Sequence, residues 1–282
     1  MKRMLLIWGL MAGLLAGACT VLEDRSVCPC YLTVDLTKVD KGVREWQMWL
    51  FTPEGELLYK DTVYRRSYSA PYIIQVPRNK KVQCLMWGNA RSGTLVEETF
   101  SPATSLIKKE DVLADSLYFF ADTISTWGED SRMKVVPRKE FATVDIYMQG
   151  WADVEYEVRM VMVCGSKGFY VTGDFYPGEV STEMELFSLG DYYTQFRGRI
   201  LRQSDTENIL LSLKIRRRKM DGTLGEELVN KDIPIGKYLE ENGYNIQNAD
   251  LGDIRMEVDY SYTNLKIKAE DWEATYKIAE EI

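Results

Sequence analysis

Residues 30–36 have the sequence CYLTVDL, in which Leu32, Val34 and Leu36 alternate with polar side chains. Because successive side chains of a strand point to opposite faces, this alternation predicts a half-buried β-strand. A second stretch with the same pattern, ATVDI, occupies residues 142–146. The two stretches decide the fold, since each begins a series of short strands separated by turns.

The two series are related by a constant spacing. Val144 lies 110 positions after Val34, and the same spacing places Tyr156 on Trp46, Met160 on Leu50 and Gly165 on Gly55. A repeat of this length predicts two copies of one β-unit. Short strands at regular spacing, without strand–helix alternation, are typical of antiparallel sandwiches. The sequence therefore predicts an all-β protein with two tandem β-sandwich domains, at residues 30–131 and 132–282.

Turn residues and periodicity predict the individual elements. In the first domain we expect a hairpin of 46–51 with 56–63, a pair of 72–76 with 81–87, a helical turn within 106–113, and a strand at 117–121. In the second we expect strands at 141–148, 254–262 and 265–269, a pair of 156–163 with 169–171, a hairpin of 209–217 with 226–233, and a short helix at 235–241 that ends at Asn242-Gly243. For the tail, 273–282, a strand, a helix and a disordered end all remain open.

The N-terminus has the three parts of a secretory signal peptide. Lys2 and Arg3 precede an apolar run, residues 4–15, and small residues lead to Cys19. The run is shorter than the roughly 20 residues that span a membrane. Residues 15–19, LAGAC, resemble a bacterial lipobox, although Ala16 stands where the commonest form has leucine.

A lipobox implies cleavage after Ala18 and acylation of Cys19. We therefore predict a signal peptide at residues 1–18 and a lipidated N-terminus with its tether at residues 19–29. The alternative is an ordinary signal peptide with an unmodified Cys19. Glu23 and Asp24 resemble the signal that sends some lipoproteins to the outer face of the outer membrane.

Composition excludes several kinds of function. The formal net charge is −8, whereas nucleic-acid binding depends on basic residues that neutralise phosphates. The basic run at residues 216–219 adjoins a turn, and we expect it to be solvated. The chain contains no histidine, which removes Ser-His-Asp and Cys-His catalysis and imidazole zinc sites. We expect no catalytic residues, no metal and no cofactor.

Four cysteines remain besides Cys19. They are Cys28, Cys30, Cys84 and Cys164. Four cysteines allow three pairings that sequence cannot choose among, although a bridge from Cys28 to Cys30 would close a very tight ring. No pair of C-x-x-C motifs is present, so structural or free thiols are the expectation.

Several motifs together resemble a known family. These are the lipobox with LEDRS at 22–26 and CPCYLTVDL at 28–36, LMWGN at 85–89, VPR at 136–138, IPI at 233–235, and residues 267–272. In order and spacing they resemble the fimbrillin-A-associated anchor proteins of type V pili. The resemblance implies two transthyretin-like β-sandwiches on an outer-membrane lipoprotein that seats a pilus and limits its length. It also implies pilin (fimbrillin) subunits as partners, held by β-strand docking.

Two other functions remain as alternatives. A surface lipoprotein could bind glycans or host proteins, because Trp46 and Trp49 point to opposite faces of one strand and one of them could be exposed. The opposing interpretation is that both are core residues of a strand covered on both faces. A carboxylate-based hydrolase would need acids such as Glu257 and Asp259, but their pattern is that of a solvated strand face.

Overall fold

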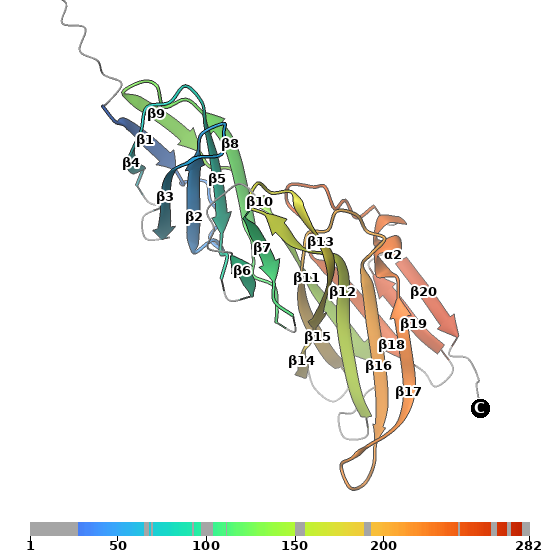
Figure 1. Ribbon diagram of the computed structural model, residues 1–282. Helices are drawn as coiled ribbons and strands as arrows, with labels where there is room; N and C mark the ends of the chain where they lie inside the picture. The colour runs from blue at the N-terminus through green and yellow to red at the C-terminus, as the bar shows by residue number, and fades with distance from the viewer. Residues whose placement is uncertain are drawn as a thin grey trace, which may run out of the picture.

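The computed structural model of the chain describes residues 28–64, 68, 70–91, 93–96, 104–110, 112–149, 156–188, 193–241, 243–260, 264–269 and 272–277. Within these residues the secondary structure is almost entirely β-strand, and α2 (Ile235–Glu241) is the one helix. The strands form two sandwiches that follow one another along an elongated molecule (Figure 1). The predicted fold class is confirmed.

The first sandwich packs a three-stranded sheet, in the order β4-β1-β9, against a five-stranded sheet, in the order β10-β8-β5-β2-β3. β1 is antiparallel to β4 and parallel to β9. The strands are β1 (Cys30–Asp35), β2 (Glu45–Phe51), β3 (Leu57–Tyr64), β4 (Tyr72–Val76), β5 (Val82–Gly88), β8 (Tyr118–Ile124), β9 (Asp130–Lys134) and β10 (Arg138–Lys139).

Period-two alternation explains why these residues form strands. Leu32 and Val34 of β1 have no exposed surface, whereas Tyr31 between β1's buried residues is 45% exposed. Their partners across the core include Trp46 and Met86, which belong to the facing sheet. Burying apolar surface in this way is the main favourable contribution to folding.

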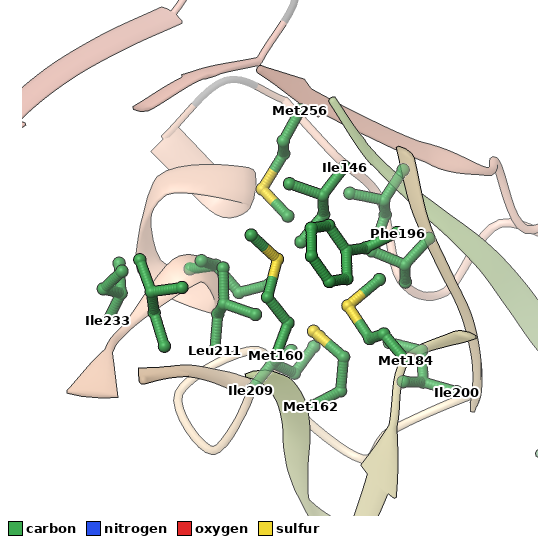
Figure 2. Packing of buried hydrophobic residues seen from close by; sticks show 14 of the residues in the cluster. Ile146, Met160, Met162, Met184, Phe196, Ile200, Ile209, Leu211, Ile233 and Met256 are labelled. Carbon is green, nitrogen blue, oxygen red and sulfur yellow. The ribbon is translucent and has the colours of Figure 1, made fainter. Parts of the chain in front are cut away.

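The second sandwich packs a six-stranded sheet, in the order β14-β15-β11-β18-β19-β20, against a sheet built around β12, in the order β17-β16-β12-β7-β6, with β13 also paired to β12. Its core is rich in methionine: Figure 2 shows Met160, Met162, Met184 and Met256 around Phe196. The strands are β11 (Phe141–Gln149), β12 (Tyr156–Tyr170), β13 (Phe175–Glu183), β14 (Glu185–Ser188), β15 (Tyr193–Leu201), β16 (Leu210–Arg218), β17 (Leu224–Ile233), β18 (Ile254–Tyr260), β19 (Asn264–Ala269) and β20 (Trp272–Lys277). The tail, for which the sequence left a strand, a helix and a disordered end open, begins with the strand β20, which pairs with β19.

The two sandwiches share one strand order. β11 lies between antiparallel β15 and parallel β18, just as β1 lies between β4 and β9. In the facing sheets, β13-β12-β16-β17 repeats the order β3-β2-β5-β8. The spacing of 110 residues correctly relates β1 to β11 and β2 to β12.

The predicted pairing of 156–163 with 169–171 is wrong, because β12 runs without interruption through both stretches. Gly165 lies where the β12–β13 ladder changes register, not in a turn. The chain reverses instead at Gly173, whose φ of 95° matches the φ of 87° at Gly55 after β2. Glycine within a strand commonly marks a bulge or a close approach of backbones. At Gly168, an added Cβ would lie 1.9 Å from the carbonyl oxygen of Leu106.

Two further expectations in the first half are wrong. β4 and β5 do not pair with each other, since β4 belongs to the sheet of β1 and β5 lies between β2 and β8. The loop between them crosses from one sheet to the other, so that Ile74 and Met86 enter the same core from opposite sides. A helical turn was expected within residues 106–113, but residues 105–108 form the strand β7.

β6 (Thr94–Val96) and β7 (Ser105–Lys108) connect the two sandwiches. They lie between β5 and β8 in sequence but pair with each other and with the end of β12. Beside them, an apolar cluster joins Trp87 of β5 to Phe169 of β12, and the indole nitrogen of Trp87 donates to the carbonyl of Val171 at 2.9 Å. The domain boundary expected between residues 131 and 132 falls inside β9.

A buried ion pair also lies at this junction. Arg202, 2% exposed at its side chain, donates to the fully buried carboxylate of Glu140 at 2.8 Å, and Arg138 contacts the same carboxylate. Arg202 also donates to the carbonyls of Lys139 and Asn248 at 2.6 and 2.7 Å. The guanidinium therefore ties the segment between the sandwiches to β15 and to the loop after α2.

Candidate functional site

Cys19, the predicted lipidation site, and the tether through residue 27 lie outside the described residues. The first described residue, Cys28, is exposed and lies directly before β1. β1 begins at the end of the first sandwich that is farther from the second (Figure 1). In the part of the chain with described coordinates, no helix has the length and apolarity needed to cross a bilayer.

The four cysteines that the structure describes are all free. Burial raises the pKa of the Cys164 thiol to about 12 and that of Cys84 further still. A thiol held protonated in this way is neither a nucleophile nor a metal ligand at neutral pH. No group of three or more potential metal-ligating side chains is found among the described residues.

A docking function requires a sheet edge with unpaired backbone groups. Among the described edge strands of four residues or more, β4 is the one without a charged side chain; β3, β9, β13, β14, β17 and β20 each carry at least one. Charged side chains on an edge oppose pairing with another chain. β4 therefore presents the edge best suited to receive an added strand.

Two apolar side chains are exposed beside this edge. Ile73 of β4 is 60% exposed. Tyr31 of the neighbouring strand β1 lies diagonally opposite Ile73 on the same outer face of the sheet. Below the edge, the hydroxyl of Tyr72 donates to Asp61 of β3, which also accepts from Tyr59 at 3.1 Å. Burial and the Asp61 carboxylate raise the pKa of Tyr72, so this bridge between the two sheets is uncharged at the tyrosines. The edge is therefore held in place from within its own sandwich.

Sequence reasoning did not single out β4, although its signal was present. The run 72–76, YIIQV, is short, β-prone and uncharged, which is typical of a strand that can pair with another chain. Its edge position depends on the partners of β1 and β5, which sequence alone did not give correctly.

The tryptophans that motivated glycan binding are both in the core. Trp46 has no exposed surface and Trp49 is 2% exposed. β2 is apolar on both faces because one face packs against the three-stranded sheet and the other packs against the junction with the second sandwich. Trp49 therefore offers no surface to a ligand.

The charged residues noted in the sequence are solvated. Glu257 and Asp259 are exposed on β18, and in the strand register they lie opposite Lys268 and Lys266 of β19. The basic run at 216–219 ends β16, where Arg216 pairs with Glu227 across the hairpin at 3.1 Å. Neither set forms a site that could hold a substrate.

Comparisons with known proteins identify the fold. Scans of the sequence against protein families and against curated proteins give no match. Among solved structures, the fimbrial anchor protein Mfa2 from Porphyromonas gingivalis aligns with a TM-score of 0.64 and 13% identity, over 87% of this chain and 99% of that protein. A protein from Bacteroides thetaiotaomicron provisionally named as an adhesin aligns with a TM-score of 0.63 and 15% identity, over 89% of this chain and 99% of that one.

A second Bacteroides thetaiotaomicron protein, provisionally named as polysaccharide-binding, aligns with a TM-score of 0.63 and 13% identity, again over 89% of this chain and 99% of that protein. The chain thus has the two-sandwich fold that these proteins share, over nearly their whole length. The fold expected from the family resemblance is confirmed.

Proposed function

We propose that this chain is an outer-membrane lipoprotein, exposed at the cell surface, that anchors a type V pilus and helps to limit its length. The observation that carries the proposal is the shared fold with a protein named as a fimbrial anchor, which extends over 99% of that protein. The lipobox-like sequence before Cys19 supports attachment to a membrane. We propose no enzymatic activity for the chain.

Lipid attachment at Cys19 explains how one protein can resist the pull of a pilus. Each buried acyl methylene contributes about 0.8 kcal/mol, and although a single chain binds marginally, two or three chains on one residue make release negligible. Cys19→Ala should therefore release the protein from membranes and shed pili into the medium. Full retention of the variant in the membrane fraction would overturn this part of the proposal.

In this proposal, the first pilin docks at β4 by adding an extended segment to the β4-β1-β9 sheet. Backbone hydrogen bonds would supply affinity, and the exposed Ile73 would contact alternate side chains of the incoming strand. Ile73→Lys places a charge on this uncharged edge and should increase the fraction of pili in the culture medium. Leu186→Lys on β14 is the matched control, since Leu186 is 53% exposed on another edge. Equal shedding by the two variants, at equal amounts of membrane-bound protein, would argue against β4.

A surface lipoprotein that binds glycans or host proteins is the second candidate. One solved structure of the same fold is provisionally named as polysaccharide-binding, which keeps this function open. Because Trp49 is buried, the aromatic residue to test is the exposed Tyr31. Glycan-array binding that disappears in Tyr31→Ala, with pili still attached to cells, would favour this function over anchoring.

A further inference from the structure

The end of the first sandwich at which β1 begins is formed by two loops, residues 77–81 and 125–129, which we call the tether pole. Cys30 lies opposite Val76, the last residue before the first loop. The backbone nitrogen of Tyr31 donates to the carbonyl of Glu129 in the second loop at 2.8 Å. The start of β1 therefore lies between the two loops (Figure 1).

Thr126 fixes the loops to each other. It is completely buried, and its hydroxyl donates to the carbonyl of Pro77 at 2.8 Å. Its backbone nitrogen donates to the carbonyl of Asn79 at 2.9 Å, and the Asn79 backbone nitrogen donates to its hydroxyl at 3.0 Å. With Thr126 held inside, the next residue, Trp127, is directed outward.

Trp127 is 52% exposed, whereas Trp46, Trp49 and Trp87 are at most 2% exposed. The ammonium group of Lys80 lies 5.6 Å from the centre of the Trp127 ring. This cation–π contact covers part of the indole and leaves half of its surface in water. Of the four tryptophans whose exposure is described, at positions 46, 49, 87 and 127, Trp127 is therefore the one that presents its ring to solvent.

The charges at the pole have both signs. Lys80 and Lys81 are exposed, Arg78 is half-buried, and Glu129 and Asp130 are exposed at the same end. The basic side chains outnumber the acidic ones by one, so electrostatic attraction to an anionic surface is modest. An indole flanked by lysines is the chemistry found where proteins meet the interface between water and lipid.

We propose that the tether pole rests on the anionic headgroup region of the membrane that holds the N-terminus, with Trp127 in the interface and Lys80 and Lys81 against lipid phosphates. The proposal rests on the lipid attachment proposed above. Nine residues, 19–27, precede Cys28, and even fully extended they span about 30 Å. A pole held so close to the bilayer has a high effective concentration there, so a weak contact is sufficient. The contact would set the direction in which the elongated molecule points from the membrane.

The other basic and apolar protrusion cannot make this contact. Arg217, Arg218 and the fully exposed Met220 lie at the tip of the β16–β17 hairpin. That tip lies beside Tyr156, at the end of β12 remote from the first sandwich, and Figure 1 places it at the opposite end of the molecule from the start of β1. It therefore provides a matched control on the same chain.

The first experiment uses the native lipoprotein in vesicles that contain brominated phospholipid, which quenches tryptophans in the interface. The emission of Trp127 is the difference between the wild-type emission and that of Trp127→Phe, and the brominated lipid should quench this difference strongly. The mass of the mature N-terminus is measured on the same sample. A lipidated, vesicle-bound protein whose Trp127 emission is not quenched overturns the inference and leaves the proposed function standing, whereas an unmodified Cys19 overturns the proposed lipid anchor.

The second experiment does not depend on lipidation. The mature chain carrying Cys19→Ser is mixed with phosphatidylglycerol–phosphatidylcholine vesicles at low salt and roughly millimolar lipid, which reproduces the effective concentration that the tether would provide, and binding is measured by flotation. Removing a lysine charge near an anionic surface weakens binding about fivefold, so Lys80→Gln with Lys81→Gln should weaken it about 25-fold. Arg217→Gln with Arg218→Gln, the same charge change at the far tip, should have less than a twofold effect. Equal losses from the two pairs, or no binding by the parent chain, would overturn the inference.

Discussion

Replacement of Arg202 is the sharpest test of how the two sandwiches are joined. Arg202→Met keeps most of the apolar volume but removes the guanidinium from the Glu140 carboxylate and from the carbonyls of Lys139, Asn248 and Ile246. Removal of one partner of a buried ion pair costs about 3–5 kcal/mol. The Glu140 carboxylate then keeps Arg138, whose side chain is 41% exposed, but loses its buried partner. We expect a loss of that size in the free energy of unfolding, measured by urea titration with two independent probes.

Two controls separate this effect from a general loss of charge. Arg197→Met on β15, the strand that Arg202 follows, breaks a pair with Asp145 whose side chains are 49% and 22% exposed, so it should cost less than about 1 kcal/mol. Glu140→Gln introduced into Arg202→Met should recover part of the loss, because it removes the buried negative charge that has lost its buried partner. A cost of less than about 1 kcal/mol for Arg202→Met, or no recovery in the double variant, would refute the reasoning.

The pH dependence of the same variant has a definite sign. Burial raises the pKa of Glu140 above its ordinary value of 4.5, and its arginine partners oppose the rise. With Arg202 removed, the pKa of Glu140 in the folded state should rise further. A carboxyl whose pKa is higher when folded binds a proton more tightly in the folded state, so acidification stabilises the fold until the unfolded carboxyl also titrates. The loss of unfolding free energy in Arg202→Met, relative to the wild type, should therefore be smaller at pH 5 than at pH 8.

Three further outcomes are expected. Gly168→Ala should destabilise the chain by about 1–3 kcal/mol in urea titrations, because its Cβ would meet a β7 carbonyl at 1.9 Å, whereas Gly252→Ala, whose nearest neighbour is 3.7 Å away, should be nearly neutral. Asp35 accepts hydrogen bonds from Thr37 and an arginine of β9, which lower its pKa to about 2. Its stabilising contribution is therefore present above pH 4 and lost as the pH falls toward 2. NMR titration of Asp35 should give a midpoint at about 2, and Asp35→Asn should make the free energy of unfolding less dependent on pH in the acid range. Thiol labelling of the folded protein should modify the exposed Cys28 and leave the buried Cys164 unmodified, and rapid labelling of Cys164 would contradict the packing.

Elements that depend on neighbouring residues were predicted well. The β2–β3 hairpin turns at Gly55 and the β16–β17 hairpin at Gly222, each with positive φ, and α2 ends before Gly243, also with positive φ. Glycine favours these conformations through its own backbone, so the sequence carries the information locally. The internal repeat was visible for the same reason, because the alternating pattern of β1 recurs in β11.

Elements that depend on distant partners were predicted poorly. β12 is uninterrupted because β7, β13 and β16 supply hydrogen bonds along its length, and its glycines admit a close neighbour where a turn was expected. Periodicity predicts that a segment is a strand but does not identify its neighbours, so β4 and β5 were paired across what is a change of sheet. The sequence left the exposure of Trp49 open for the same reason, because side chains of its cluster such as Phe169 belong to the second sandwich.

By itself, the sequence determined the all-β class, the duplicated unit and the lipobox-like motif at Cys19, because each is written in residue type and spacing. Only the tertiary structure decided that β4 is an uncharged edge, that Trp127 is exposed at the tether pole, and that Arg202 and Glu140 meet at the junction. Exposure and pairing are properties of what lies nearby in space, and residues far apart in the chain supply those neighbours.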